Sequence, residues 1–203
     1  MKTNKPKWLL YHHFGGTISN PYFDSSKETL EQIDDYHKSL KFYLSSLGYR
    51  VGYHWLIFPD GTIIQTRAKT DEGCHCVGKN TDSLSIGLVG NFSRPIWKIN
   101  HLPTREQEKS FAELGVEICK EFNIPLSKVL GHNFFKNTQC PGLNLPENWG
   151  RNLIGAELNE DEDEIKIELL KKKIGILQKL VQIYIKILRL FNKVGGIKDF
   201  EDN

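Results

Sequence analysis

The chain has 203 residues, 39% hydrophobic and 26% charged, which is typical of one well-buried globular domain with room for an appendage. Its formal net charge of +2 gives no electrostatic reason to expect DNA or RNA as a partner. No run of about 18 apolar residues occurs, and the apolar stretch Trp8–Tyr11 is too short for a secretory signal, so neither a transmembrane helix nor a signal peptide is expected.

The first predicted elements are a strand and a helix. Trp8–His13 is typical of a strand, in which successive side chains point to opposite faces. Ser25–Glu28 fits a capping box, which predicts the start of a helix. Apolar residues at helical spacing continue this helix through Leu47, and Gly48 is a natural end for it.

The middle of the chain continues this alternation of strands and helices. The segments expected there are, in chain order, a hairpin of Val51–Phe58 and Thr62–Thr66, a strand at Leu84–Val89, a helix opened by Thr104 and Gln107, and a strand at Lys128–Gly131. The order strand, helix, hairpin, strand, helix, strand predicts an α/β fold. We expect a single mixed central β-sheet flanked by helices, followed by a C-terminal amphipathic helix.

The composition of the chain changes near its end. Residues 156–164 contain a nearly continuous acidic run and are interpreted as a solvated linker. Within 165–195, apolar residues recur at alternating steps of three and four, as in a heptad seam, and a second row widens the apolar face. Such a helix must self-associate, lie on a membrane surface or pack back on the domain, and we favour a homo-oligomer. Residues 196–203 form a tail.

Two histidines and one cysteine lie where separate segments can converge on one cleft. His12 lies at the end of the first predicted strand, His132 follows the last one, and Cys140 comes eight residues later. Two imidazoles and a thiolate would leave one tetrahedral position for water, as catalytic zinc sites require. Spacing alone also allows a surface histidine and an unrelated buried thiol.

Ordered sequence segments make this interpretation more specific. They are LYHH (10–13), VGYHWLI (51–57) with DGT (60–62), GCHCVGKN (73–80), SIGLVGNF (85–92), and GH (131–132) with TQCPG (138–142). In this order they resemble the zinc-dependent N-acetylmuramoyl-L-alanine amidases, a family that includes amidase-type phage lysozymes and peptidoglycan recognition proteins. The resemblance covers roughly residues 8–150.

The resemblance implies a zinc amidase domain over residues 1–155, in which His12, His132 and Cys140 bind Zn²⁺. Its substrate would be peptidoglycan, cut at the amide bond between N-acetylmuramic acid and L-alanine. Because no signal peptide is evident, such an enzyme would stay in the cytoplasm until release and then act on the cell wall, as a phage or prophage endolysin does. The alternative is a non-catalytic recognition module. Such members typically lose a zinc ligand, most often the cysteine, so the presence of Cys140 favours catalysis.

The resemblance also implies catalytic and substrate-binding positions. Tyr53 and Thr138 would donate hydrogen bonds to the developing oxyanion or help to protonate the leaving amine. The implied substrate-binding residues are His75, Asn80 and Arg67. Thr66 stands where the family commonly has glycine, which weakens the case for a substrate contact at the following arginine.

The remaining histidines and cysteines are expected to have other roles. His13 follows His12 in a strand and faces the other way, so both cannot bind one metal ion. His37 and His54 are expected to be structural or to orient a ligand. The cysteines expected to be reduced thiols are Cys74, Cys76 and Cys119.

Overall fold

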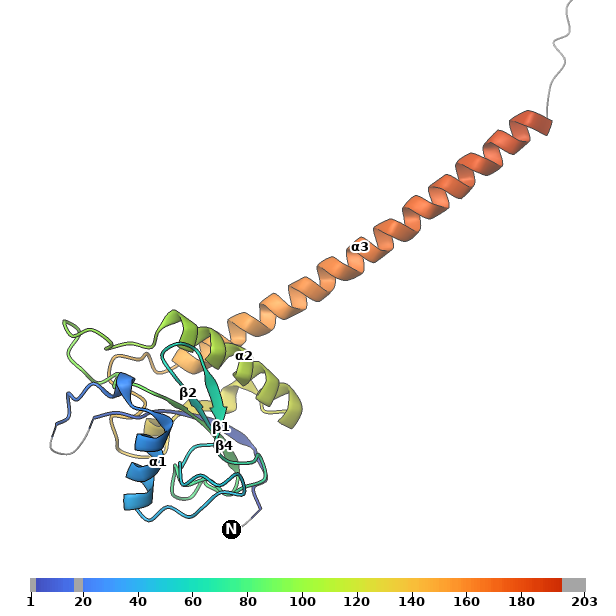
Figure 1. Cartoon of the computed structure of the whole chain (residues 1–203). Coiled ribbons are helices and arrows are strands. Elements are labelled where there is room, and N and C mark those ends of the chain that lie inside the picture. Colours follow the sequence, from blue (N-terminus) through green and yellow to red (C-terminus); the bar gives the residue numbers. More distant parts are fainter. Residues whose placement is uncertain (1–2, 17–19, 195–203) are drawn as a thin grey trace, which may run out of the picture. The chain divides into compact units, whose positions relative to one another are not determined.

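The computed structural model describes residues 3–16 and 20–194 and divides into two units, Met1–Leu158 and Asn159–Asn203. The first unit contains a five-stranded mixed sheet with the order β3-β2-β4-β1-β5 (Figure 1). The strands are β1 (Trp8–His13), β2 (Trp55–Ile57), β3 (Ile63–Gln65), β4 (Ser83–Leu88) and β5 (Val129–Gly131). The helices are α1 (Leu30–Ser39), α2 (Arg105–Phe122) and α3 (Trp149–Val194), with short 3-10 helices η1 (Ser25–Lys27), η2 (Leu126–Lys128) and η3 (His132–Phe134). The predicted α/β fold with one mixed sheet is confirmed.

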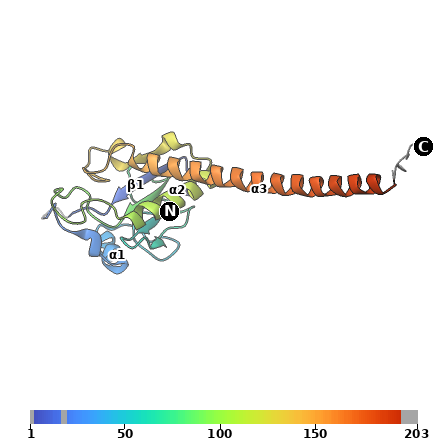
Figure 2. The ribbon, with the colours of Figure 1, turned by 90° about the horizontal axis from the view of Figure 1, so that it is seen from above.

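Helices α1 and α2 cover opposite faces of this sheet (Figure 1, Figure 2). On the α2 face, Tyr11 of β1 meets Phe111 of α2 edge-on, with ring centroids 5.6 Å apart. On the α1 face, Ile33 of α1 packs against Leu56 of β2 and Val89. Since side chains alternate along a strand, β2 contributes Trp55 and Ile57 to the first layer and Leu56 to the second.

The central strand β4 presents two different faces, because large apolar and small residues alternate along it. Leu84, Ile86 and Leu88 belong to the core under α2. The alternate positions, on the face covered by α1, are Ser83, Ser85 and Gly87. Gly87 pairs with His12 of β1, so this side-chain-free position lies beside the end of that strand.

Helix α1 begins with a different cap from the predicted one. The prediction of a capping box at Ser25–Glu28 is wrong. Asp24 caps the short η1 helix there, and its side chain accepts a hydrogen bond from the Ser26 N–H. The capping box of α1 is formed instead by Thr29 and Gln32, each of which accepts a hydrogen bond from the other's backbone N–H. The two candidate boxes lie four residues apart, so the pattern alone does not choose between them.

Helix α1 also ends at Ser39, two turns before the predicted end. Lys41 adopts the left-handed conformation, with φ of 61°. The carbonyl of Tyr43 accepts a hydrogen bond from the Arg67 guanidinium at 2.9 Å instead of from a helical N–H. The leucines that continue the apolar spacing are 45–50% exposed, so they bury no helical face: Leu40, Leu44 and Leu47.

The hairpin and the second capping box agree with the sequence prediction. Strands β2 and β3 pair antiparallel, although β2 is shorter than the predicted Val51–Phe58. Thr104 Oγ1 accepts from the Gln107 N–H at 3.0 Å, and Gln107 Oε1 accepts from the Thr104 N–H at 3.2 Å. Both signals are local, which explains why the sequence predicts them.

The predicted acidic linker is part of a helix. Residues 156–164 lie within α3, and the boundary between the two units falls among them, after Leu158. Acidic residues are helix formers or only weakly unfavourable, and the segment holds no glycine or proline that would end a helix. No described helix is long and apolar enough to cross a membrane. The predicted tail, 196–203, lies outside the described residues.

Candidate metal centre and active site

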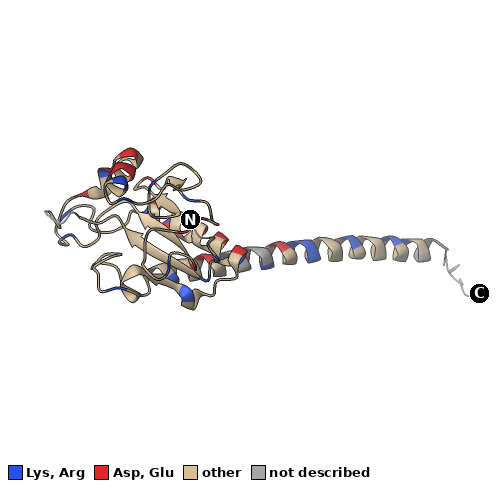
Figure 3. Cartoon of the chain, turned by 90° about the horizontal axis from the view of Figure 1, so that it is seen from below, with Lys and Arg blue, Asp and Glu red and all other residues tan. Residues whose placement is uncertain are grey.

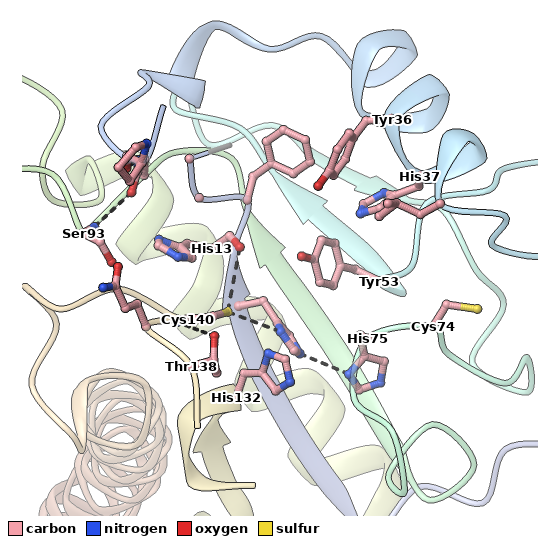
Figure 4. Close-up of a pocket in the computed structure, with 18 of the residues that line it drawn as sticks. His13, Tyr36, His37, Tyr53, Cys74, His75, Ser93, His132, Thr138 and Cys140 are labelled. Carbon is pink, nitrogen blue, oxygen red and sulfur yellow. Dashed lines mark hydrogen bonds between the residues drawn. The ribbon is translucent and has the colours of Figure 1, made fainter. Parts of the chain in front are cut away.

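A cavity of about 450 Å³ opens at the carboxyl end of β1, on the side of the sheet that carries α1 (Figure 4). It is lined by residues from β1, α1 and the loops around residues 53, 75, 91 and 138. All three predicted metal ligands and both predicted catalytic residues line it: His12, His132, Cys140, Tyr53 and Thr138. The structure therefore brings together five positions that are scattered through the sequence.

Parallel pairing brings the two predicted histidine ligands together. Strands β1 and β5 are parallel neighbours, with Tyr11 opposite Gly131, so His12 and His132 leave the sheet at the same edge. Their ring centroids are 4.6 Å apart. Cys140 reaches the same point from the following loop, and its Sγ lies 3.5 Å from His12 Nδ1. One atom from each of the three residues lies within 4.8 Å of the others.

The chemistry of this donor set fits a zinc ion. Two imidazole nitrogens and one thiolate are three of the four donors of a tetrahedral site, and the cavity leaves room for the fourth. Among the described residues, no further His, Cys, Asp or Glu joins the group. Burial lowers the pKa of His12 and of His132, so both rings are neutral and can offer a lone pair. Burial also raises the pKa of Cys140 to about 12, so the thiolate requires a neighbouring cation.

His13 lies beside this group but has a different partner. Its Nδ1 accepts a hydrogen bond from the Phe92 N–H at 3.0 Å. Only its backbone carbonyl approaches the group, 3.9 Å from Cys140 Sγ. As expected from strand alternation, the structure places His12 in the group and His13 outside it.

A chain of hydrogen bonds behind His12 determines which of its nitrogens faces the metal site. Ser83 Oγ donates to the Lys79 carbonyl at 2.6 Å, so its oxygen accepts from His75 Nε2, 3.3 Å away. The neutral His75 ring then has a lone pair on Nδ1, which accepts from His12 Nε2 at 3.1 Å. His12 is left with a lone pair on Nδ1, the atom that lies 3.5 Å from Cys140 Sγ. His75 therefore orients His12 as well as lining the cavity.

Asn80 shapes the loop that carries His75. Its Oδ1 accepts from the backbone N–H groups of His75 and Cys76, at 3.0 and 2.9 Å. Asn80 and His75 also line a second cavity of about 450 Å³, to which Lys41 and Lys136 contribute. Two of the three predicted substrate-binding residues, Asn80 and His75, thus border open space, and His75 borders both cavities.

Arg67, the third predicted substrate-binding residue, lies in neither cavity. It is fully buried, and its guanidinium donates to the carbonyls of Val51 at 2.6 Å, Tyr43 at 2.9 Å and Glu72 at 3.3 Å. It also lies over the Tyr43 ring, 5.1 Å from the centroid. The prediction that Arg67 contacts the substrate is therefore wrong. Its hydrogen bonds to these carbonyls make Arg67 a link between three loop segments.

Tyr53 and Thr138 are placed differently with respect to the metal ligands. The Tyr53 ring centroid is 5.0 Å from that of His12, and its hydroxyl points into the cavity (Figure 4). Burial raises the pKa of Tyr53, so its hydroxyl keeps its proton and can donate it in a hydrogen bond. Thr138 Oγ1 accepts from the Cys140 N–H at 3.2 Å and so holds the turn that carries the thiol.

His37 is a cavity residue for which the sequence indicated only a structural or orienting role. Its ring stacks on Phe42, with centroids 5.1 Å apart, and meets Tyr53 edge-on at 5.6 Å. Its Nδ1 is buried, without a hydrogen-bond partner among the described residues. By contrast, His54 is fully bonded within the fold, because Nε2 donates to the Asp71 carbonyl and Nδ1 accepts from Ser85.

Comparison of the sequence and the fold with known proteins identifies a family. The sequence profile of the N-acetylmuramoyl-L-alanine amidases matches residues 2–143. Peptidoglycan-recognition protein 2 of Holotrichia diomphalia is 31% identical over 148 residues, which cover 70% of this chain and 71% of that protein. The solved structure of the endolysine N-acetylmuramoyl-L-alanine amidase LysCS from Clostridium intestinale URNW has a TM-score of 0.59 and 26% identity, covering 78% of this chain and 89% of that one. Drosophila PGRP-LB shares the fold, with a TM-score of 0.53 and 23% identity, over 70% of this chain and 77% of that one. The chain therefore belongs to the N-acetylmuramoyl-L-alanine amidase family.

Proposed function

We propose that the protein is a zinc-dependent hydrolase that cuts the amide bond between N-acetylmuramic acid and L-alanine in peptidoglycan. The observation that carries the proposal is the convergence of His12, His132 and Cys140, whose donor atoms lie within 4.8 Å of one another in an open cavity. Retention of all three donors supports catalysis over recognition alone. The similarity to LysCS, an amidase by name, supports the same reaction.

The residues of the site have separable roles in this reaction. A zinc ion bound by the three donors would supply Lewis-acid catalysis and a water molecule of lowered pKa. Tyr53 directs a protonated hydroxyl into the cavity, where it donates to the oxygen of the amide carbonyl as negative charge develops there. His75 holds the His12 ring in the orientation that the site needs, and Thr138 holds the Cys140 turn.

The two cavities fit a substrate with more than one part. The cavity at the donor group and the one beside Asn80 share the lining residues Phe42, Cys74, His75 and His132. A substrate that joins a sugar to a peptide at the cleaved bond requires space on both sides of the metal centre. Peptidoglycan fits this requirement.

The biological setting that we propose is that of a phage or prophage endolysin. The name of LysCS, an endolysine, supports this assignment by similarity. In that setting the enzyme would remain in the cytoplasm until it is released to the cell wall.

Digestion of purified sacculi tests the reaction directly. Mass spectrometry of the soluble products should show free stem peptides that begin with L-alanine, while the glycan strands stay intact. Cys140→Ser should abolish this release and lower the zinc content, whereas His101→Ala, in a loop outside the cavity, should change neither. Full zinc occupancy without release of peptides would identify a recognition module, and cut glycosidic or peptide bonds would refute the amidase reaction.

A further inference from the structure

The second unit contains a basic apolar segment, which we define as Leu169–Leu190 of α3. Its 22 residues include six Lys and Arg residues and no Asp or Glu. Thirteen of the 22 are apolar, and twelve of these are 42–62% exposed. Figure 3 shows basic residues recurring along this part of the helix. Contact between water and an apolar surface of this size is unfavourable, so we expect another surface to cover it.

After Lys173, the polar residues of the segment occupy a narrow stripe. From Ile174 onward the polar residues and one glycine lie one, three or four positions apart, which places them on one side of an α-helix. They are Gly175, Gln178, Lys179, Gln182, Lys186 and Arg189. All other positions between 174 and 190 are apolar, so the apolar arc extends around well over half of the helix. This arc is much wider than the seam of a two-stranded coiled coil.

The charges of the segment do not favour a second copy of the same chain as the partner that covers its apolar surface. Helices that pair as coiled coils usually place opposite charges beside the apolar seam. The basic apolar segment contains only positive charges, so the same segment of a second copy would supply no opposite charge to pair with them. The acidic residues of α3 are at positions 157–168, before the segment.

We propose that the basic apolar segment binds the surface of a bilayer that contains anionic phospholipid. The apolar arc would enter the interface between headgroups and acyl chains, and the polar stripe would face the headgroups and water. A helix crossing the bilayer would instead bury Lys179 and Lys186 in hydrocarbon, at a high cost. The complementary charge of the headgroups supplies the negative partner that the segment itself lacks. This inference does not depend on the amidase reaction.

Co-sedimentation of the full chain with vesicles tests the proposal. We expect binding to vesicles of phosphatidylcholine and phosphatidylglycerol and much weaker binding to vesicles of phosphatidylcholine alone. Binding should weaken at about 1 M salt, where the Debye length falls to about 3 Å. Equal binding to both kinds of vesicle would refute the role of charge.

Two sets of substitutions separate the basic stripe from the apolar arc. Replacing Lys179, Lys186 and Arg189 by Gln should weaken vesicle binding on the order of a hundredfold, because each basic residue contributes separately near an anionic surface. Replacing Leu177, Leu180 and Leu188 by Gln keeps the charge and should weaken binding by a similar or larger factor. The matched control replaces three exposed lysines of the first unit by Gln: Lys38, Lys98 and Lys109.

The three sets of variants distinguish insertion of α3 from a general attraction between charges. A loss of binding in the control set as large as in the stripe set would refute a specific site on α3. If the leucine variant bound vesicles as well as the wild type, insertion of the apolar arc into the bilayer would be refuted. Only attraction between the basic residues and an anionic surface would then remain. Absence of vesicle binding by the unaltered chain would refute the proposal, and a concentration-dependent rise in its mass by sedimentation equilibrium would then identify a second copy as the partner.

Discussion

Removing the hydrogen-bond acceptor behind His12 should weaken zinc binding by one to two orders of magnitude. In His75→Leu, the His12 Nε2–H loses its partner at 3.1 Å in a site where His12 is only 1% exposed. A buried donor without a partner costs about 1–3 kcal/mol, equivalent to about a 5- to 150-fold change in an equilibrium constant. This range matches the 10- to 100-fold loss typical when a residue supporting a metal ligand is removed.

Two further variants grade the effect along the chain of hydrogen bonds. His75→Gln keeps an acceptor and should restore most of the zinc affinity. Ser83→Ala leaves the acceptor on His75 in place and removes only the next bond, at 3.3 Å. Its zinc affinity should therefore fall less than that of His75→Leu, because the bond to His12 remains and only the more distant His75 donor loses its partner.

Competition of the metal-free protein with a chromogenic chelator measures these affinities without relying on activity. The control is His101→Ala, which removes an imidazole from a loop outside the donor group, where its Nδ1 contacts the Lys98 carbonyl. Thermal unfolding should confirm that the variants fold. Wild-type zinc affinity in a folded His75→Leu protein would refute the orienting role, as would a Ser83→Ala defect equal to that of His75→Leu.

Four other substitutions test separate parts of the structure. Tyr53→Phe should lower kcat about 100- to 1,000-fold, with zinc affinity unchanged in the chelator assay, because it removes one donor to the oxyanion. Arg67→Leu should lower the unfolding free energy by about 3 kcal/mol in urea, with KM unchanged in the folded fraction, because carbonyls from separate loops lose their donor. Gly87→Ala should lower kcat and retain zinc, since a Cβ there would lie 2.4 Å from Tyr53 Cδ2. His54→Gln tests linkage to pH. Burial lowers the pKa of His54 to about 4, so as the pH falls below about 6.5 the unfolded chain binds a proton first and stability is lost down to about pH 4. The unfolding free energy of the variant, measured in urea at pH 7 and pH 5, should therefore fall less than that of the wild type. The difference should be about 1.4 kcal/mol for each pH unit below about 6.5.

Features set by neighbouring residues could be predicted from the sequence. The strand Trp8–His13 and the Thr104 capping box depend on contacts within a few positions, and both occur as predicted. The meeting of His12 and His132 was also predictable in outline, because His12 lies at the end of a strand, His132 follows one, and the family resemblance ordered the segments. That they share one edge required β1 and β5 to be parallel neighbours, which the sequence alone does not show.

Features that depend on distant partners were not predictable. Arg67 looks like a loop residue available to substrate, but its partners Val51 and Tyr43 lie 16 and 24 positions away. The apolar spacing after Ser39 continues the pattern of α1 although those leucines remain exposed. Likewise, the sequence placed His75 near the groove but carried no information on its bond to His12, 63 positions away.

The central strand β4 contributes both to the packing of the fold and to the geometry of the site. Its leucine and isoleucine side chains anchor the sheet to α2, and its small residues leave space on the opposite face. Ser83 supports His75, and Gly87 leaves room for the Tyr53 ring, whose centroid lies 5.0 Å from that of His12. Enlarging these small positions would move the side chains that orient a ligand or face the substrate, while the metal donors themselves stay in place. The loss would then appear in catalysis and metal affinity before it appears in stability, because the apolar face of the same strand is unchanged.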